Sequence, residues 1–316
     1  MTTAAPTYRL TAADRVLELG RRPWLMGVVN ASPDSFSDGG RYATLDERVD
    51  LAAELVGAGA DILDIGGESA STGRPPVEVG REIERVVPLI ERVVAELGAI
   101  VSVDTYKPEV AREAIVAGAS IVNDVSGLHD PELAEVCAQT GAALIVMHTR
   151  AAPKQRMQDP DLYDEVTQDV LSFLRGRIAV ALQAGVLREQ LVVDPGPDFA
   201  KTPAQTVESL ANVSRLHALG RPLLMAISRK DFIGALTGRA PRERLAGTLA
   251  ALAHGVDAGA HIFRMHDIAA ASDFLRVRAA LAGELAPNRD LALAEELRHD
   301  RPIADAAAES SPVPDL

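Results

Sequence analysis

The sequence has one cysteine and few aromatic residues. Cys137 is the only cysteine among 316 residues, which excludes an internal disulfide and a zinc site built from cysteines. Phe, Trp and Tyr together make up 3% of the chain, so the hydrophobic core must consist mainly of Ala, Val, Ile and Leu. This composition suits short buried strands of a parallel sheet that are covered by alanine-rich helices.

Positive charge is also scarce. The chain has 32 Lys and Arg against 45 Asp and Glu, a formal net charge of -13 at pH 7. A chain this acidic binds polyanions poorly, so we expect neither nucleic acid nor a membrane surface as a partner. No apolar run approaches the roughly 20 residues that span a bilayer, and the start of the sequence lacks the pattern of a secretion signal. We therefore predict a cytoplasmic protein. If it binds a phosphate group, a local cluster of positive side chains must provide the binding site.

Short apolar runs alternate with longer amphipathic patterns through most of the chain. The runs are rich in β-branched residues and Leu, as expected for strands buried on both faces. The predicted strands are Leu25–Asn30, Ile62–Gly66, Ile100–Asp104, Ser120–Asp124, Ala143–His148, Leu191–Asp194, Leu223–Ile227 and Ile262–Met265. Eight strand-then-helix units predict an α/β fold, a (β/α)8 TIM barrel. An open doubly wound sheet is the alternative, but no Gly-x-Gly-x-x-Gly follows the first strand.

The two ends of the chain fall outside this pattern. We expect a polar entry segment over residues 1–22, the barrel over 23–285, and an Ala-, Glu- and Pro-rich tail over 286–316. The tail is predicted to be disordered, with a helix over Asp290–Arg298 at most.

Polar residues recur at the predicted carboxyl ends of the strands. Active sites of (β/α)8 barrels lie at that end. Any one of these residues could be a loop cap, but a polar group at each of eight strand ends favours a functional site. They include Asn30, Asp64, Asp104, Asn123, His148, Asp194, Lys230, Arg264 and His266.

Seven strings resemble, in order, the signature set of the dihydropteroate synthase family. They are GVVNASPDSFSDGG, DIGGES, SVDTYK, IVNDVSG, VVDPGPDFAKT, ISRKDFIG and FRMHD. The resemblance runs from about Leu25 to Leu281 and implies a pterin-binding (β/α)8 barrel, Mg²⁺ and a homodimer. The implied reaction joins 6-hydroxymethyl-7,8-dihydropterin diphosphate to para-aminobenzoate and releases pyrophosphate, a step of folate biosynthesis.

The residue types suit such a pterin. Its ring has adjacent N–H groups beside a carbonyl, so a buried carboxylate can accept two hydrogen bonds from it. Asp194 is the candidate carboxylate, with Asn123 facing another part of the ring and Lys230 donating on the carbonyl side. Asp194 could instead be a structural cap before the following Pro-Gly. The resemblance also implies substrate contacts for Phe36, Arg229 and Asp231.

The diphosphate requires positive charge. Arg264 and His266 are two residues apart on one strand, so their side chains share a face and can donate to phosphate. Asn30 and Asp38 offer the hard oxygen ligands that suit Mg²⁺. An anion at Asp104 would stabilise the cation formed as the C–O bond breaks. The predicted catalytic residues are Asp104, Lys230, Arg264 and His266.

Two departures from the family concern the second substrate. The family loop G-G-E-S-T-R-P-G is replaced by GGESASTGRPP, which leaves Thr72 and Arg74 at shifted positions. The Ser that usually follows S-R-K, and that meets the aminobenzoate carboxylate, is Asp231. Two carboxylates about 4 Å apart at an effective permittivity of about 20 repel by about 4 kcal/mol. We therefore predict poor use of para-aminobenzoate, unless Asp231 is only a helix N-cap.

Three alternative functions follow from these observations. A pterin-binding paralogue that does not condense its ligand would keep the pterin half and lose the acceptor half. A pterin-dependent methyl transferase to a corrinoid partner would not need the diphosphate residues. A barrel aldolase would need a Schiff-base lysine, for which Lys230 is the candidate.

Overall fold

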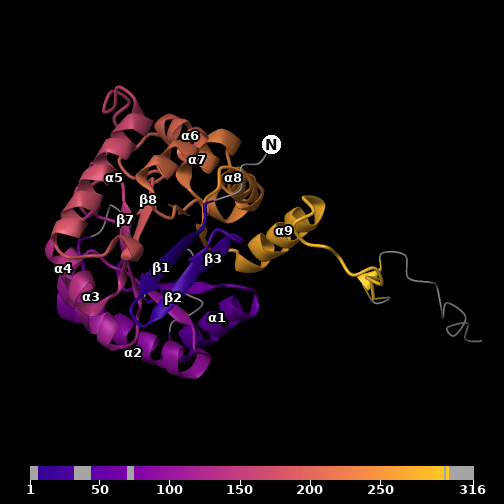
Figure 1. Cartoon of the computed structure of the whole chain (residues 1–316), viewed down its shortest axis with the longest axis horizontal. Coiled ribbons are helices and arrows are strands. Elements are labelled where there is room, and N and C mark those ends of the chain that lie inside the picture. The colour runs from indigo at the N-terminus through magenta and orange to yellow at the C-terminus, as the bar shows by residue number, and fades with distance from the viewer. Residues whose placement is uncertain (1–5, 32–43, 70–74, 295–296, 299–316) are drawn as a thin grey trace, which may run out of the picture. The chain divides into compact units, whose positions relative to one another are not determined.

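The computed structural model of the chain describes residues 6–31, 44–69, 75–294 and 297–298 (Figure 1). The chain divides into two compact units, Met1–Leu275 and Arg276–Leu316. The first unit contains every strand among the described residues, as well as the predicted site residues.

Eight parallel strands form a ring in the first unit. Their order is β8-β7-β6-β5-β4-β3-β10-β9, and a parallel bridge between Val193 and Leu223 joins the two ends of the sheet. The strands are β3 (Trp24–Asn30), β4 (Ile62–Gly66), β5 (Ile100–Asp104), β6 (Ile121–Asp124), β7 (Ala143–Met147), β8 (Leu191–Asp194), β9 (Leu224–Met225) and β10 (Ile262–Met265). The predicted (β/α)8 barrel is confirmed.

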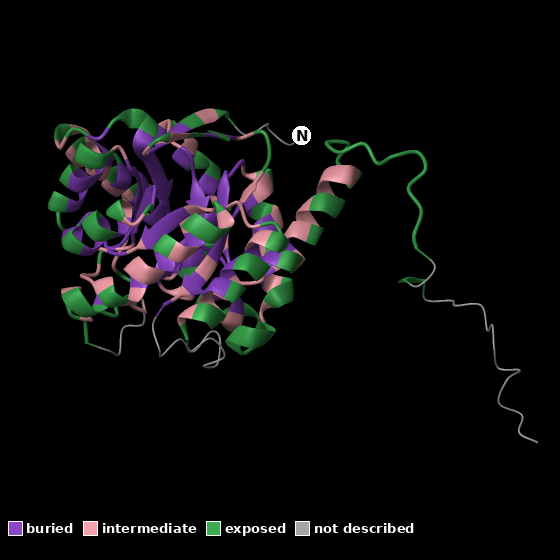
Figure 2. Ribbon diagram, turned by 90° about the horizontal axis from the view of Figure 1, so that it is seen from below, coloured by how far each residue is buried: buried purple, intermediate pink, exposed green. Residues whose placement is uncertain are grey.

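Helices alternate with these strands and cover the outside of the ring. They are α1 (Leu45–Gly57), α2 (Val79–Leu97), α3 (Pro108–Val116), α4 (Glu132–Thr140), α5 (Val166–Gln183), α6 (Pro203–Ala211), α7 (Asp231–Thr237) and α8 (Leu245–Asp257). A further helix, α9 (Ile268–Leu281), follows β10 and includes residues of both units. Figure 2 shows buried strands inside and exposed residues on the outer faces of the helices. Every residue of β4, β6, β7 and β8 is buried, as expected for strands covered on both faces.

Local sequence sets several helix ends. Thr44 begins α1 with a capping box, in which its hydroxyl accepts the Glu47 N–H and the Glu47 carboxylate accepts the Thr44 N–H. Thr202 and Gln205 make the same pair of bonds at the start of α6. Gly141 ends α4 in the left-handed conformation.

Two predicted elements differ from the structure near the seventh strand. The strand is only Leu224–Met225, and the short helix α7 follows it before Gly238 ends that helix with φ 70. The apolar periodicity after this strand predicts one helix, over Arg242–Val256, and only the interpretation of Asp231 as an N-cap allows a short helix before it. The seven residues of α7 show too little periodicity to be recognised, and the helix is held by packing of the buried Phe232 and Ile233.

A β-hairpin precedes the barrel, where we expected only a polar entry segment. β1 (Tyr8–Ala12) pairs antiparallel with β2 (Arg15–Leu19). Leu10 and Leu19 are fully buried against residues at the starts of the barrel strands, among them Met26. The hairpin therefore closes the amino-terminal end of the barrel and leaves the carboxyl ends of the strands for a site.

The second unit has no helix over its described residues 283–294, so the helix that the sequence allowed at most over Asp290–Arg298 is absent from residues 290–294. Instead, the Asn288 side-chain oxygen accepts the Asp290 N–H in a turn, and residues 283–294 are exposed. A helix this short is marginal in water without tertiary packing. Within the described part of the chain, no helix has the length and apolarity needed to span a membrane.

Candidate active site

The carboxyl ends of the strands surround a cavity of about 750 Å³. Its wall comes from the loops that follow β4, β5, β6, β7, β8 and β9. The charged and aromatic lining residues are Glu68, Glu82, Asp104, Tyr106, Lys154, Arg156, Asp198, Phe199, Arg229, Lys230 and Asp231. Four of the residues predicted from the sequence, Asp104, Arg229, Lys230 and Asp231, are therefore on the cavity wall.

A charge cluster at this end of the barrel centres on Arg264 of β10. Its Nε donates to Asp64 of β4 at 2.6 Å, and one Nη donates to Asp104 of β5 at 2.7 Å. Asn123 of β6 also donates its Nδ2 to Asp64, at 3.1 Å. Four strands thus contribute to one network, which brings together three of the predicted site residues. Two of the Arg264 N–H groups are bonded to carboxylates of the barrel, so the remaining N–H groups are the ones that can donate to a ligand.

Asp64 is one of the polar strand-end residues of the sequence, but the sequence analysis gave it no role in the site. Its side chain is fully buried, and its Oδ1 has no hydrogen-bond partner among the described residues. The signal was available, because an aspartate in the middle of the apolar run ILDIG must be paired if it is buried.

The acidity of Asp104 is strongly altered by its surroundings. Burial raises the pKa of Asp104, Arg264 opposes this change, and the nearby Asp64 and Glu82 add to it. Its carboxyl can therefore hold or release a proton closer to neutral pH than an ordinary aspartate does.

Asp194 lies at the end of β8 and is 3% exposed. Its Oδ1 accepts the N–H of Gly196 at 2.7 Å, so the predicted turn-capping contact is present. Burial raises the pKa of Asp194 to about 6, against the Gly196 hydrogen bond and the charge of Lys230. Gly196 is required here, because its φ is 62 and a Cβ would lie 2.0 Å from the His148 carbonyl oxygen.

Lys230 and Arg229 follow β9 and have different surroundings. The Lys230 ammonium lies 4.5 Å from the ring centroid of Phe199, and burial lowers its pKa. Arg229 donates two hydrogen bonds to Asp267, at 3.0 and 2.6 Å. Lys230 therefore faces the cavity beside an aromatic ring, whereas the Arg229 guanidinium is held by a carboxylate at the end of β10.

His266 directly follows β10 and is bonded to Ser228. The Ser228 hydroxyl oxygen accepts the His266 backbone N–H at 3.1 Å and lies 3.0 Å from Nδ1. Burial, with the charges of Arg264 and Arg229, lowers the pKa of His266 to about 3. The imidazole is therefore neutral at pH 7, and a hydroxyl hydrogen directed at Nδ1 leaves Nε2 as the N–H donor.

Asp231 is the first residue of α7 and not its N-cap, which is Lys230. The interpretation of Asp231 as an N-cap is therefore wrong. Its side chain is 69% exposed and pairs with Arg244 at 3.0 Å. Its backbone N–H is bonded to Asp198, which follows β8.

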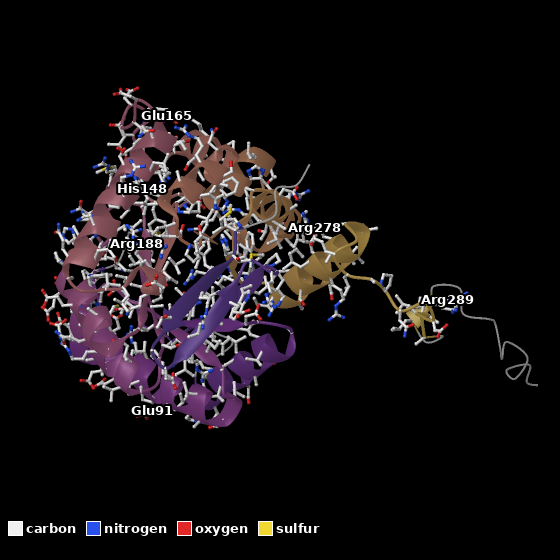
Figure 3. The ribbon with its side chains drawn as sticks, in the orientation of Figure 1. Glu91, His148, Glu165, Arg188, Arg278 and Arg289 are labelled. Carbon is white, nitrogen blue, oxygen red and sulfur yellow. The ribbon has the colours of Figure 1, made fainter. Side chains whose placement is uncertain are left out.

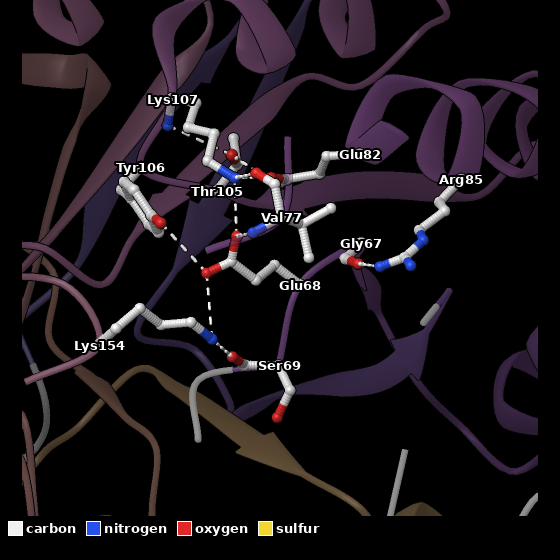
Figure 4. A network of polar contacts seen from close by, with 10 residues as sticks. All are labelled: Gly67, Glu68, Ser69, Val77, Glu82, Arg85, Thr105, Tyr106, Lys107 and Lys154. Carbon is white, nitrogen blue, oxygen red and sulfur yellow. Dashed lines mark hydrogen bonds and ion pairs between the residues drawn. The ribbon is translucent and has the colours of Figure 1, made fainter. Parts of the chain in front are cut away.

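A second buried network, shown in Figure 4, joins the loop after β4 to the loop after β5. The Lys107 ammonium donates to Glu68 at 2.7 Å, to the Val77 carbonyl at 2.6 Å and to Glu82 at close range. Lys154, from the loop after β7, pairs with Glu68 at 3.1 Å. The contacts fix Glu68 at the cavity wall.

A third network lies behind Asp194. The fully buried Lys201 donates to His148 Nδ1 at 2.7 Å and to the Gly196 carbonyl at 2.9 Å. His148, which lies between β7 and α5 (Figure 3), contacts Asp169 through Nε2 at 2.9 Å. Burial lowers the pKa of Lys201 to about 7, and burial together with Lys201 lowers that of His148 to about 4. Lys201 thus holds the turn that carries Asp194, a role that its place in DFAKT did not reveal.

Some predicted residues cannot be placed. Phe36, Asp38, Thr72 and Arg74 lie outside the described residues. Asn30 ends β3 and is partly buried. Within residues 6–31, 44–69, 75–294 and 297–298, no three His, Cys, Asp or Glu side chains form a metal-binding group.

Comparisons with known proteins agree with this geometry. The family model described as pterin binding enzyme matches residues 26–266. Dihydropteroate synthase of Synechocystis is 40% identical over 274 residues, which cover 86% of this chain and 94% of that protein. The Escherichia coli K12 enzyme is 40% identical over 85% of this chain and 95% of its own.

Solved structures give the same result. Xanthomonas albilineans dihydropteroate synthase with 4-aminobenzoic acid has a TM-score of 0.80 and 42% identity, covering 89% of this chain and 100% of that one. The same enzyme in complex with 7,8-dihydropteroate has a TM-score of 0.77 and 42% identity, covering 88% and 100%.

The (β/α)8 fold and the match of residues 26–266 to the pterin binding enzyme model place the chain in the class of pterin-binding barrel enzymes. Within that class, the chain belongs to the dihydropteroate synthase family.

Proposed function

We propose that the chain condenses 6-hydroxymethyl-7,8-dihydropterin diphosphate with para-aminobenzoate and releases pyrophosphate. The observation that carries this proposal is the meeting of Asp194, Asn123, Lys230 and Arg264 at the carboxyl ends of the strands. Similarity to synthases over most of the chain supports the transferase activity, and no described residue favours the paralogue that does not condense its ligand.

The pterin ring would be held by three side chains. Asp194 accepts ring N–H groups, and Lys230 donates to the ring carbonyl. Asn123 donates its Nδ2 to Asp64, which leaves its carbonyl oxygen as an acceptor for another ring N–H. Lys201 keeps the Asp194 turn in place through the Gly196 carbonyl.

The leaving diphosphate would meet Arg264 and the neutral His266. Arg264 retains N–H groups beyond the two that face Asp64 and Asp104, and His266 offers Nε2–H. The C–O bond breaks toward pyrophosphate, and the carboxylates of Asp64 and Asp104 stabilise the cation on the dihydropterin. The uncharged aromatic amine then forms the C–N bond, and its proton passes to the departing pyrophosphate.

A Mg²⁺ ion fits this arrangement as a partner of the diphosphate. Mg²⁺ is commonly held by one or two protein oxygens plus substrate phosphates and water. Asn30 offers an amide oxygen at the end of β3, and the described residues contain no metal cage. When bound, the ion neutralises charge that develops on the leaving group. Asp38 is the second proposed ligand.

The family resemblance also supports a homodimer and a location in the cytoplasm. Both are parts of the proposal, and sedimentation equilibrium of the purified chain measures the first of them.

Isotope-traced condensation tests the function. Labelled para-aminobenzoate is incubated with the pterin diphosphate, Mg²⁺ and the protein, and the labelled product and pyrophosphate are quantified. Equal amounts of both are expected. Calorimetry with the pterin diphosphate alone separates loss of binding from loss of chemistry, and binding without any labelled product would favour the paralogue.

A further inference from the structure

Asp198 is a charged residue in the cavity wall to which the proposed reaction gives no role. It follows β8 and lines the cavity beside Phe199 and Lys230. Its φ is 67, in the left-handed region that residues with a Cβ rarely adopt. A strained residue at the wall of a site is a candidate for a functional role.

The carboxylate of Asp198 accepts a hydrogen bond from a backbone N–H of the same wall, so that this N–H is not available to a ligand. Its Oδ2 accepts the backbone N–H of Asp231 at 2.6 Å. Its Oδ1 is buried and lacks a hydrogen-bond partner among the described residues. A buried oxygen without a partner opposes folding, so this carboxylate is not explained by stability alone.

Two arginines beside the contact between Asp198 and Asp231 are already engaged by anions. Arg229 is bonded to Asp267, and Arg244 pairs with Asp231. Lys230 faces both Asp194 and Asp198, whose charges favour its protonated form. A further carboxylate at this end of the cavity would therefore share Lys230 with two other anions.

The acceptor of the proposed reaction would lie close to Asp198. Asp194 is buried, whereas Asp198, Phe199 and Asp231 line the open cavity. If the pterin is bonded to Asp194, the acceptor arylamine enters from the open cavity and lies next to Asp198, Phe199 and Asp231. The Phe199 ring offers an apolar face against which an arylamine can pack.

We propose that Asp198 determines acceptor specificity by disfavouring arylamines that bear a carboxylate, relative to uncharged arylamines. This inference rests on the proposed function, because the arylamine is the acceptor of that reaction. A carboxylate must displace Asp198 from the Asp231 N–H or remain close to it without a donor. A neutral carboxamide meets no such repulsion. The enzyme still condenses para-aminobenzoate, at a higher KM than it would have without the Asp198 charge.

Steady-state kinetics with two acceptors tests this inference. Para-aminobenzoate and 4-aminobenzamide are compared on the parent chain, on Asp198→Asn and on Asp198→Gly, with Asp50→Asn as a control that removes an exposed charge on α1. For both Asp198 variants we expect kcat/KM for para-aminobenzoate to rise about tenfold, through KM. The value for the amide should change less than twofold, and Asp50→Asn should alter neither. Equal changes for both acceptors, or no change, would overturn the inference.

A binding measurement separates this inference from the proposed function. Calorimetry on protein saturated with the pterin diphosphate and Mg²⁺ uses 4-methylbenzoate and 4-methylbenzamide, which have no amine and cannot condense. The parent should bind the amide more tightly, and Asp198→Asn should narrow the difference. This result in a chain that makes no product would refute the function and keep the role of Asp198.

The reverse result is equally informative. A chain that condenses both acceptors, but whose preference is unmoved by Asp198→Asn, would keep the function and refute the role of Asp198. Asn adopts positive φ more readily than most residues and Gly adopts it freely, so at least one variant should melt within a few degrees of the parent.

Discussion

The two ends of the barrel are held together by different kinds of interaction. At the amino-terminal end, the hairpin β1–β2 buries Leu10 and Leu19 against the starts of the strands. At the carboxyl end, Asp64, Asp194 and Arg264 are held in place by hydrogen bonds and charge pairing. Burial of apolar side chains stabilises the amino-terminal end, whereas buried charges at the carboxyl end oppose folding unless they are paired. The difference indicates that stability and function are separated along the barrel axis.

The largest effect is expected from Asp194→Ala at the carboxyl end. Loss of the carboxylate removes the partner of the pterin N–H groups, so affinity for the pterin diphosphate should fall more than about a hundredfold. Calorimetry measures the affinity, and circular dichroism should show an unchanged fold. Asp194→Asn, which can still accept the Gly196 N–H, separates the two roles of the residue. An affinity within tenfold of the parent for Asp194→Ala would mean that Asp194 is only a cap.

Leu19→Ala should destabilise the amino-terminal end of the barrel. Removing a fully buried leucine side chain is expected to lower the free energy of unfolding by about 2–5 kcal/mol. At a temperature where the variant remains folded, kcat should stay within about twofold of the parent, since Leu19 lies away from the cavity. Urea unfolding and turnover measure the two quantities. Leu236→Ala is the control, because that side chain is 69% exposed. A large loss of kcat in folded Leu19→Ala protein would contradict the separation of the two ends.

The pH dependence of pterin binding should sharpen the comparison. The pKa of Asp194 is raised to about 6 by burial. Below this pH the carboxyl is protonated and accepts fewer hydrogen bonds, so affinity should fall as the pH drops from 7 to 5. Calorimetry across this range provides the test, and the affinity of Asp194→Asn should fall less than that of the parent, because the contribution of Asp194 to the decline is removed.

The smallest effect is expected from Asp231→Ser. The sequence-based estimate of about 4 kcal/mol assumed a close, unscreened pair of carboxylates. In the structure Asp231 is 69% exposed and paired with Arg244, and both features reduce its repulsion of a ligand. We expect less than about a threefold gain in kcat/KM for para-aminobenzoate, well below that of Asp198→Asn. Steady-state assays of both variants would reveal the opposite order if Asp231 were the dominant charge.

Sequence pattern alone predicted the barrel and the polar residues at the carboxyl ends of its strands. The strands Ile62–Gly66, Ile100–Asp104, Leu191–Asp194 and Ile262–Met265 have the bounds that the sequence predicted. Parallel strands buried on both faces are almost wholly apolar, so their polar ends stand out without any structure.

Tertiary structure decided which of the polar residues pair with one another. Arg264 bonds to Asp64 across 200 positions in the sequence, and the Asp198 carboxylate accepts the Asp231 N–H across 33. The hairpin β1–β2 also depends on distant partners, because its alternating apolar residues are stabilised only by the floor of the barrel. Hydrogen bonds and charge pairing act over a few ångströms, and only the closed ring of strands brings such distant residues that close.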